Sequence, residues 1–131
     1  MPVELKMLAW SIVLGLVYVV VAVTLATMQR GLAWSASNRT GEAPLTGAAD
    51  RTSRACRNFL ETFAFFAAAV LVVVVGQRTT GTTALGAQIY FWARVIYLPV
   101  FAAGIPYLRT LIWAGSVVGL VMILSGVFGS N

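Results

Sequence analysis

The chain has 131 residues, a length typical of one domain, and 60% of them are hydrophobic while only 10% are charged. A soluble domain carries about 25% charged residues, so this composition excludes a soluble globular protein and makes membrane lipid the expected surrounding. The net charge of +5 does not favour nucleic acid as a partner, because basic residues commonly anchor the cytoplasmic loops of membrane proteins.

Four apolar segments are candidate membrane spans, since a helix needs about 20 apolar residues to cross a hydrocarbon core of roughly 30 Å. The first, residues 8–28, contains no charged residue and is too long for the core of a cleaved signal peptide. The second, 52–75, reaches spanning length only with the polar turns at its start. The third and fourth spans are residues 84–103 and 107–128.

The connections predict an all-α integral membrane protein, an up-down four-helix transmembrane bundle forming one domain over residues 1–131. The long connection, residues 29–50, is the expected cytoplasmic loop, and short connections elsewhere imply antiparallel neighbours. We expect Asp50 to cap the second helix and Pro106 to lie in the first turn of the fourth. Pro99 is expected to kink the third helix.

Basic residues are distributed unevenly between the two sides of the predicted bundle. One side holds Arg30, Arg39, Arg51, Arg54, Arg57 and Arg109; the other holds Lys6 and Arg78. Because an excess of Lys and Arg marks cytoplasmic loops, the arginine-rich side is predicted to be cytoplasmic. Both termini then lie on the non-cytoplasmic side of a multi-pass membrane protein.

The run RTSRACRNFLE carries a polar face at the start of the second span. At about 100° per residue, Arg51, Arg54, Asn58 and Glu61 fall within an arc of about 80°. Ionisable groups within a membrane span are costly and usually functional. Arginine matches carboxylates and Glu61 can accept from an ammonium group, so the face suits a small zwitterion. The alternative is that the arginines reach lipid headgroups and Glu61 pairs with another helix.

The third span contains ARVIYLPVF, in which Tyr90, Arg94, Tyr97 and Phe101 share one stripe. Arg94 lies well inside the span and needs a partner, for which Glu61 is the available intramembrane carboxylate. A structural bridge between these two side chains is one interpretation, and it is compatible with ligand binding. Tyr97 is either a ligand contact or an ordinary interfacial aromatic residue.

The fourth span starts with GIPYLRTLIW and places Arg109 and Thr110 at a helix N-terminus. An arginine and a hydroxyl in that position favour developing negative charge, such as a thiolate. The alternative is that Arg109 only anchors the span. Further along, Gly115 and Gly119 form a GxxxG pair, with Gly126 beyond, which hints at a closely packed interface.

Several classes of chemistry are disfavoured by what the chain lacks. Histidine is absent, which excludes a histidine-based triad, and the four acidic residues are too scattered to suggest a metal site. Cys56 is the sole cysteine, so no intrachain disulfide forms. We interpret it as a small packed thiol.

These motifs together resemble the MAPEG family, membrane-associated proteins in eicosanoid and glutathione metabolism, and in particular its small bacterial members. The likeness covers most of the chain and rests on the following residues: Arg51, Arg54, Asn58, Glu61, Arg94, Tyr97 and Arg109. It implies a homotrimer in the bacterial inner membrane. It also implies that glutathione, as cosubstrate, binds between protomers near the cytoplasmic face.

The resemblance also implies roles for individual residues. Glutathione would be held by Arg30 (from the neighbouring protomer), Arg54, Asn58, Glu61, Tyr97 and Thr110. Arg109 would be catalytic and stabilise the thiolate, whereas Arg51 and Arg94 would be structural or peripheral. Phe101 departs from the pattern, because the family usually has a second tyrosine there, so one ligand hydrogen bond is lost.

The implied function is that of a glutathione transferase or peroxidase acting on lipophilic electrophiles. One alternative is a small four-span proton-coupled multidrug-type transporter, for which Glu61 would be the coupling carboxylate. The arginines around Glu61 argue against that role. Another alternative, favoured by Phe101, is a non-catalytic membrane binding protein.

Overall fold

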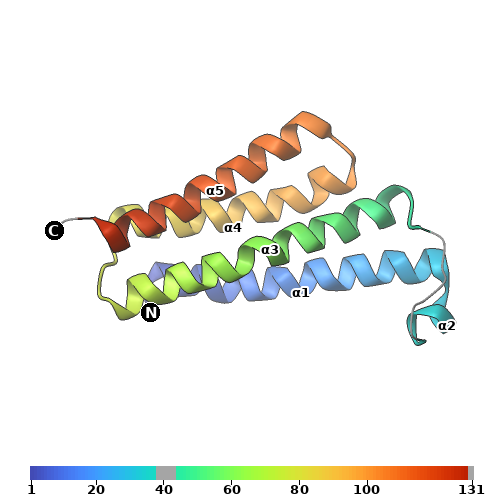
Figure 1. The fold of residues 1–131 in the computed structure, drawn as a ribbon, viewed down its shortest axis with the longest axis horizontal. Helices are drawn as coiled ribbons and strands as arrows, with labels where there is room; N and C mark the ends of the chain where they lie inside the picture. Colours follow the sequence, from blue (N-terminus) through green and yellow to red (C-terminus); the bar gives the residue numbers. More distant parts are fainter. Residues whose placement is uncertain (38–43, 130–131) are drawn as a thin grey trace.

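The computed structural model describes residues 1–37 and 44–129. In that part of the chain every regular element is a helix (Figure 1): α1 Val3–Arg30, α2 Leu32–Ser35, α3 Gly47–Val75, α4 Gly81–Ala102 and α5 Pro106–Phe128. The four longer helices are long and apolar enough to cross a membrane, and each runs antiparallel to the next in the chain. The predicted all-α bundle with four helices able to cross a membrane is therefore confirmed.

The first connection differs from the predicted loop over residues 29–50. It is shortened from both sides by α1 and α3, and it contains the single helical turn α2. Arg39 lies outside the described residues. The prediction that Asp50 caps α3 is wrong: the cap position is Thr46, and Asp50 lies in the first turn. Because this start lies in a polar stretch, no apolar periodicity marks it.

The other two connections are tight. Thr80 and Thr83 form a reciprocal capping box at the start of α4, which satisfies two orphan backbone donors. Pro106 occupies the first turn of α5 as predicted. Between α4 and α5, Gly104 adopts φ +77°, a left-handed conformation that glycine accepts at little cost.

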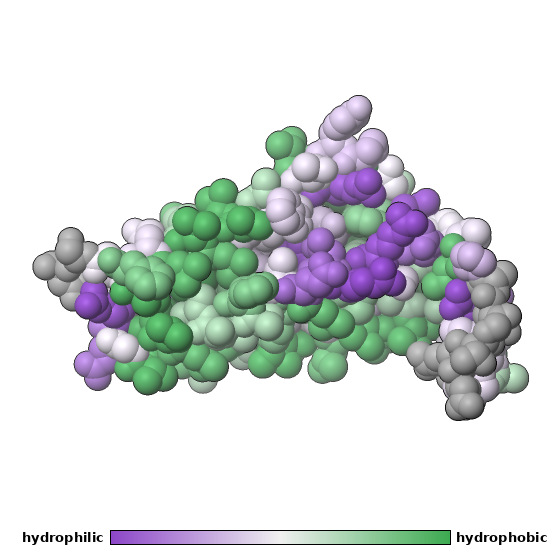
Figure 2. All heavy atoms as spheres, in the orientation of Figure 1, coloured by the Kyte–Doolittle hydropathy of each residue, from purple (hydrophilic) through white to green (hydrophobic). Residues whose placement is uncertain are grey.

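The two ends of the bundle differ in charge. The end where α1 finishes and α3 and α5 begin, hereafter the arginine-rich end, carries Arg30, Arg51, Arg54, Arg57 and Arg109. Lys6 and Arg78 lie toward the opposite end, where both termini are found (Figure 1). On the face drawn in Figure 2, a hydrophilic patch lies toward the arginine-rich end and apolar surface covers most of the remaining helices.

Two aromatic clusters fill the interior. Toward the termini, Phe66 stacks on Tyr90 with ring centroids 4.0 Å apart, and the Tyr90 hydroxyl lies 3.0 Å from Thr62 Oγ1. Toward the arginine-rich end, Tyr18 stacks on Phe59 at 4.7 Å and donates a 2.6 Å hydrogen bond to the backbone carbonyl of Arg94. These contacts fix the spacing of α1, α3 and α4 around the polar residues.

Helices α4 and α5 meet backbone to backbone. A Cβ atom built on Gly119 would lie 2.6 Å from the Gly86 carbonyl oxygen, and one on Gly86 would lie 2.7 Å from the Gly119 carbonyl oxygen. Gly126 also packs against α4, at Thr83, whereas nothing lies within 4 Å of a Cβ on Gly115. Two of the three glycines thus serve contacts inside the chain rather than an interface between chains.

Candidate functional site

The polar face of α3 is divided between the interior and the surface. Arg51 and Asn58 differ by about 20° around the helix, as do Arg54 and Glu61, and the centres of the two pairs are about 60° apart. The first pair is partly buried, whereas Arg54 and Glu61 are exposed. The polar face of α3 is narrow, yet one pair of its residues lies partly inside the bundle and the other lies on its surface.

The two arginines on this face have different partners. Arg51 donates from Nε to the backbone carbonyl of Ala102 at 2.9 Å, so it satisfies one of the last carbonyls of α4. Arg54 Nη2 lies 3.1 Å from Asp50 Oδ2 in an i,i+4 ion pair. Arg51 thus attaches the α4–α5 turn to α3, and Arg54 remains near solvent with an internal counter-ion.

Arg94 is fully buried and donates from Nη2 to Asn58 Oδ1 at 2.8 Å. Its guanidinium carbon lies 4.5 Å from the centre of the Tyr97 ring and 5.6 Å from that of Phe59. The predicted bridge to Glu61 is wrong: Asp50–Arg54 is the salt bridge found among the described residues. Glu61 fails to meet Arg94 because its position on α3 faces outward, whereas Asn58 faces α4.

A small cavity opens between α3, α4 and α5, hereafter the three-helix cavity. Its volume is about 120 Å³ and its lining is formed by Asn58, Tyr97, Arg109, Thr110 and Trp113. The Arg109 guanidinium lies 4.8 Å above the centre of the Phe101 ring. Four residues singled out from the sequence thus line one cavity.

Trp113 is the member of this lining that the sequence did not single out. It follows Arg109 by four residues, which places both side chains on the same face of α5. That spacing was the available signal, but a tryptophan near the end of a membrane span needs no functional explanation.

A second cavity, the α1–α3 cavity, has a volume of about 360 Å³. Arg30, Arg57, Cys56 and Trp34 contribute to its lining, and the Arg30 guanidinium lies 4.4 Å above the Trp34 ring. Cys56 is half-buried rather than fully packed. Within one protomer, therefore, Arg30 belongs to a different cavity from Asn58 and Arg109.

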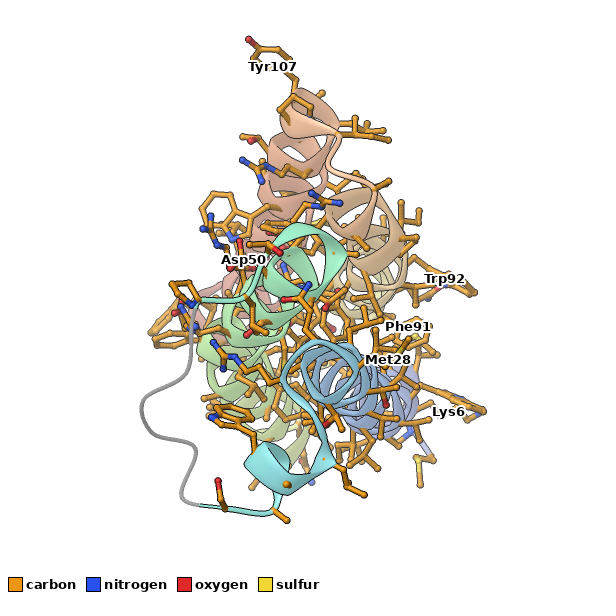
Figure 3. All side chains as sticks on the ribbon, turned by 90° about the vertical axis from the view of Figure 1, so that its right-hand side faces the viewer. Lys6, Met28, Asp50, Phe91, Trp92 and Tyr107 are labelled. Carbon is orange, nitrogen blue, oxygen red and sulfur yellow. The ribbon has the colours of Figure 1, made fainter. Side chains whose placement is uncertain are left out.

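The missing hydroxyl at Phe101 has no substitute from the next tyrosine in the chain. Tyr107, at the start of α5, is 86% exposed and points away from the bundle, as the end-on view in Figure 3 shows. Phe101 itself is buried and packs against Tyr97, with ring centroids 5.4 Å apart. The ring thus retains a packing role without a polar group.

The lining of the three-helix cavity is rich in hydrogen-bond donors. Arg109 is a permanent cation, Trp113 donates through its indole N–H, and the amide of Asn58 and the hydroxyls of Tyr97 and Thr110 can donate as well. None of the described residues that line this cavity is acidic. Such a site stabilises a negatively charged atom, because charge-assisted hydrogen bonds are the stronger ones.

Comparison with known proteins identifies the family of the chain. The model of the MAPEG family matches residues 7–129, which include nearly all of the four long helices and the linings of both cavities. Neither the curated proteins nor the solved structures gave a match. The chain, a multi-pass integral membrane protein, therefore belongs to the MAPEG family.

Proposed function

We propose that the protein is a glutathione-dependent transferase or peroxidase that acts on lipophilic electrophiles from within the membrane. The observation that carries the proposal is the meeting of Asn58, Tyr97, Arg109 and Thr110 at one donor-rich cavity. Membership of a family that includes glutathione transferases and peroxidases supports it.

In this proposal glutathione supplies the nucleophilic thiol. The guanidinium of Arg109 holds negative charge at the sulfur, since a nearby cation lowers the pKa of a thiol. The hydroxyl of Thr110, one residue beyond the first turn of α5, adds a hydrogen-bond donor beside Arg109. The apolar partner arrives laterally from the lipid, because the surrounding helix faces are hydrophobic.

The size of the cavity bears on how the ligand is held. A volume of about 120 Å³ is below the range of roughly 300–1,000 Å³ typical of small-molecule sites. We therefore place only the thiol end of glutathione inside it. The charged ends of the tripeptide would lie along the exposed Arg54 and Glu61, whose charges suit a carboxylate and an ammonium group respectively.

A homotrimer would complete such a site. Arg54, Arg57 and Glu61 are exposed on α3, which is a candidate membrane span, and charged groups facing lipid are costly. A neighbouring protomer that covers this face would bury the ligand and bring its own Arg30 toward it. Chemical cross-linking of the detergent-solubilised protein should then give a limiting species of three chains.

The distribution of charge supports a membrane orientation. With the arginine-rich end on the cytoplasmic side, the site opens toward the cytoplasm, and we infer the bacterial inner membrane with both termini on its outer side. A reporter enzyme active only outside the cytoplasm, fused to the C-terminus, should then be active.

The activity is tested with purified protein in detergent. Conjugation of glutathione to a generic aromatic electrophile and reduction of a lipid hydroperoxide are measured for the wild type and for Arg109→Ala. If neither rate exceeds that of the variant, the enzymatic proposal fails. Glutathione binding without turnover would instead identify a non-catalytic binding protein.

A further inference from the structure

Arg94 presents an electrostatic problem that the proposed function leaves unexplained. Its side chain is fully buried, and its Nε and Nη1 atoms have no hydrogen-bond partner among the described residues. The one polar side-chain contact is with Asn58, supplemented by the rings of Tyr97 and Phe59. A buried cation with so little compensation is expensive, which points to a role other than stability.

The hydrogen bond to Asn58 determines how that amide is turned. A guanidinium has donors only, so the atom of Asn58 that faces it must be the oxygen. The amide nitrogen, Nδ2, is then directed away from Arg94. The structure gives Nδ2 no partner within residues 1–37 and 44–129, and Asn58 belongs to the lining of the three-helix cavity.

We propose that Arg94 is a positioning residue, which fixes Asn58 so that its amide N–H donors are offered to the ligand, and thereby makes the three-helix cavity selective for an anion or another hydrogen-bond acceptor. Without Arg94 the amide can rotate and present its oxygen, which would repel a thiolate or carboxylate. This inference rests on the proposed function and assigns the side chain that sets the polarity of the site.

Stability and binding should respond in opposite ways to the loss of Arg94. Replacing a buried, poorly compensated charge by an apolar side chain of similar length is often neutral or stabilising. Arg94→Met should therefore melt at the wild-type temperature or above it, while its affinity for glutathione falls about tenfold, the effect of one hydrogen bond to a charged group. A purely structural role predicts a lower melting temperature instead.

The decisive experiment is a double-mutant cycle read by calorimetric titration of glutathione into the full-length protein in detergent. Asn58→Ala and Arg94→Met should each weaken binding about tenfold, and the double variant should lose no more than either one, because both remove the same donor. Arg94→Lys, which keeps a donor and the charge, should bind within about threefold of the wild type. Arg78→Met, at the opposite end of the bundle, is the matched control and should bind normally.

Asn58→Asp is a second test that does not require Arg94 to be removed. An aspartate keeps a partner for Arg94 but has no N–H to offer, so the variant should stay folded and bind glutathione at least about tenfold more weakly. Wild-type-like binding by Asn58→Asp, additive losses in the cycle, or a destabilised Arg94→Met that spares affinity would each overturn the inference alone. Failure of the wild type to bind glutathione would overturn the proposed function, and this inference with it.

Discussion

The hydroxyl of Thr83 on α4 donates a 2.5 Å hydrogen bond to Oε2 of Glu4 on α1. Both side chains are buried, and Thr83 Oγ1 also accepts from the backbone N–H of Thr80 at 2.8 Å. The carboxyl group of Glu4 therefore lies at the N-terminus of α4, where the helix dipole stabilises negative charge. This contact joins the start of the first span to the start of the third.

Glu4→Ala should lower the stability of the bundle. The change removes the contact between α1 and α4 and leaves the Thr83 hydroxyl only the Thr80 carbonyl oxygen as acceptor, at 3.0 Å, so we expect a loss of about 0.5–1.5 kcal/mol. Glu4→Gln keeps an acceptor oxygen and should lose less. Thermal unfolding in detergent measures both, with Lys6→Ala, an exposed position on the same helix, as the control. Equal melting temperatures for Glu4→Ala and Lys6→Ala would contradict the role of this contact.

Gly119→Ala should destabilise the pairing of α4 and α5. The added methyl group meets the Gly86 carbonyl oxygen at 2.6 Å, and since that atom belongs to the backbone, the helices must separate. We expect a loss of about 1–3 kcal/mol, the usual effect of overpacking. Gly115→Ala, four residues earlier and with nothing within 4 Å, should unfold at the wild-type temperature or above it, because alanine favours the helix; a similar loss there would show that the contact with Gly86 is not responsible.

Arg109→Ala should reduce glutathione-dependent turnover by about 10²- to 10³-fold, the usual effect of removing a donor that stabilises developing charge. Arg109→Lys keeps the charge but not the planar fork, so it should retain intermediate activity. Steady-state rates of both variants and of Arg78→Ala are compared. A loss as large in Arg78→Ala would mean that the effect is not specific to the site.

Phe101→Tyr should strengthen glutathione binding. The ring already packs against Tyr97 and beneath the Arg109 guanidinium, so a hydroxyl added there can reach the same ligand. One further hydrogen bond contributes about 0.5–1.5 kcal/mol. Calorimetric titration would record the gain in affinity; unchanged or weaker binding would mean that the ring does not face the ligand.

Asp50→Asn should also strengthen binding of an anionic ligand, because Arg54 then loses its internal counter-ion at 3.1 Å. Exposed pairs of this kind contribute about 0–1 kcal/mol, so the melting temperature should change little. Titration with glutathione at low and at high salt tests whether the gain in affinity is electrostatic, since salt screening should diminish an electrostatic gain. A variant that binds no better at low salt would indicate that Arg54 takes no part in binding.

The helices were predictable because long apolar runs identify membrane spans directly, and Pro106 marked one boundary. Predictions of a helix boundary or a contact that rested on one polar residue were less accurate. Asp50 was expected to cap α3, but the helix begins one turn earlier at a position that no apolar pattern marks. Helical spacing predicts one face that holds Arg51, Arg54, Asn58 and Glu61, but it does not predict that only Arg51 and Asn58 are partly buried.

The contact between Arg94 and Asn58 shows the limit of such reasoning most clearly. Charge alone favoured Glu61 as the partner, but the relative rotation of α3 and α4 decides the pairing, and aromatic packing sets that rotation. Trp113 was missed for a related reason: only the proximity of Arg109 and Tyr97 in space distinguishes it from the other tryptophans in the spans.

The backbone contact between Gly86 and Gly119 holds α4 and α5 together in the half of the bundle nearer the termini, whereas Tyr97 and Arg109 lie in the other half. Widening of the three-helix cavity would then require the arginine-rich ends of these helices to move apart. Such a movement displaces lipid acyl chains, so the lateral pressure of the bilayer would oppose the entry of a lipophilic substrate. The thickness and fluidity of the membrane would therefore affect the rate at which the cavity opens.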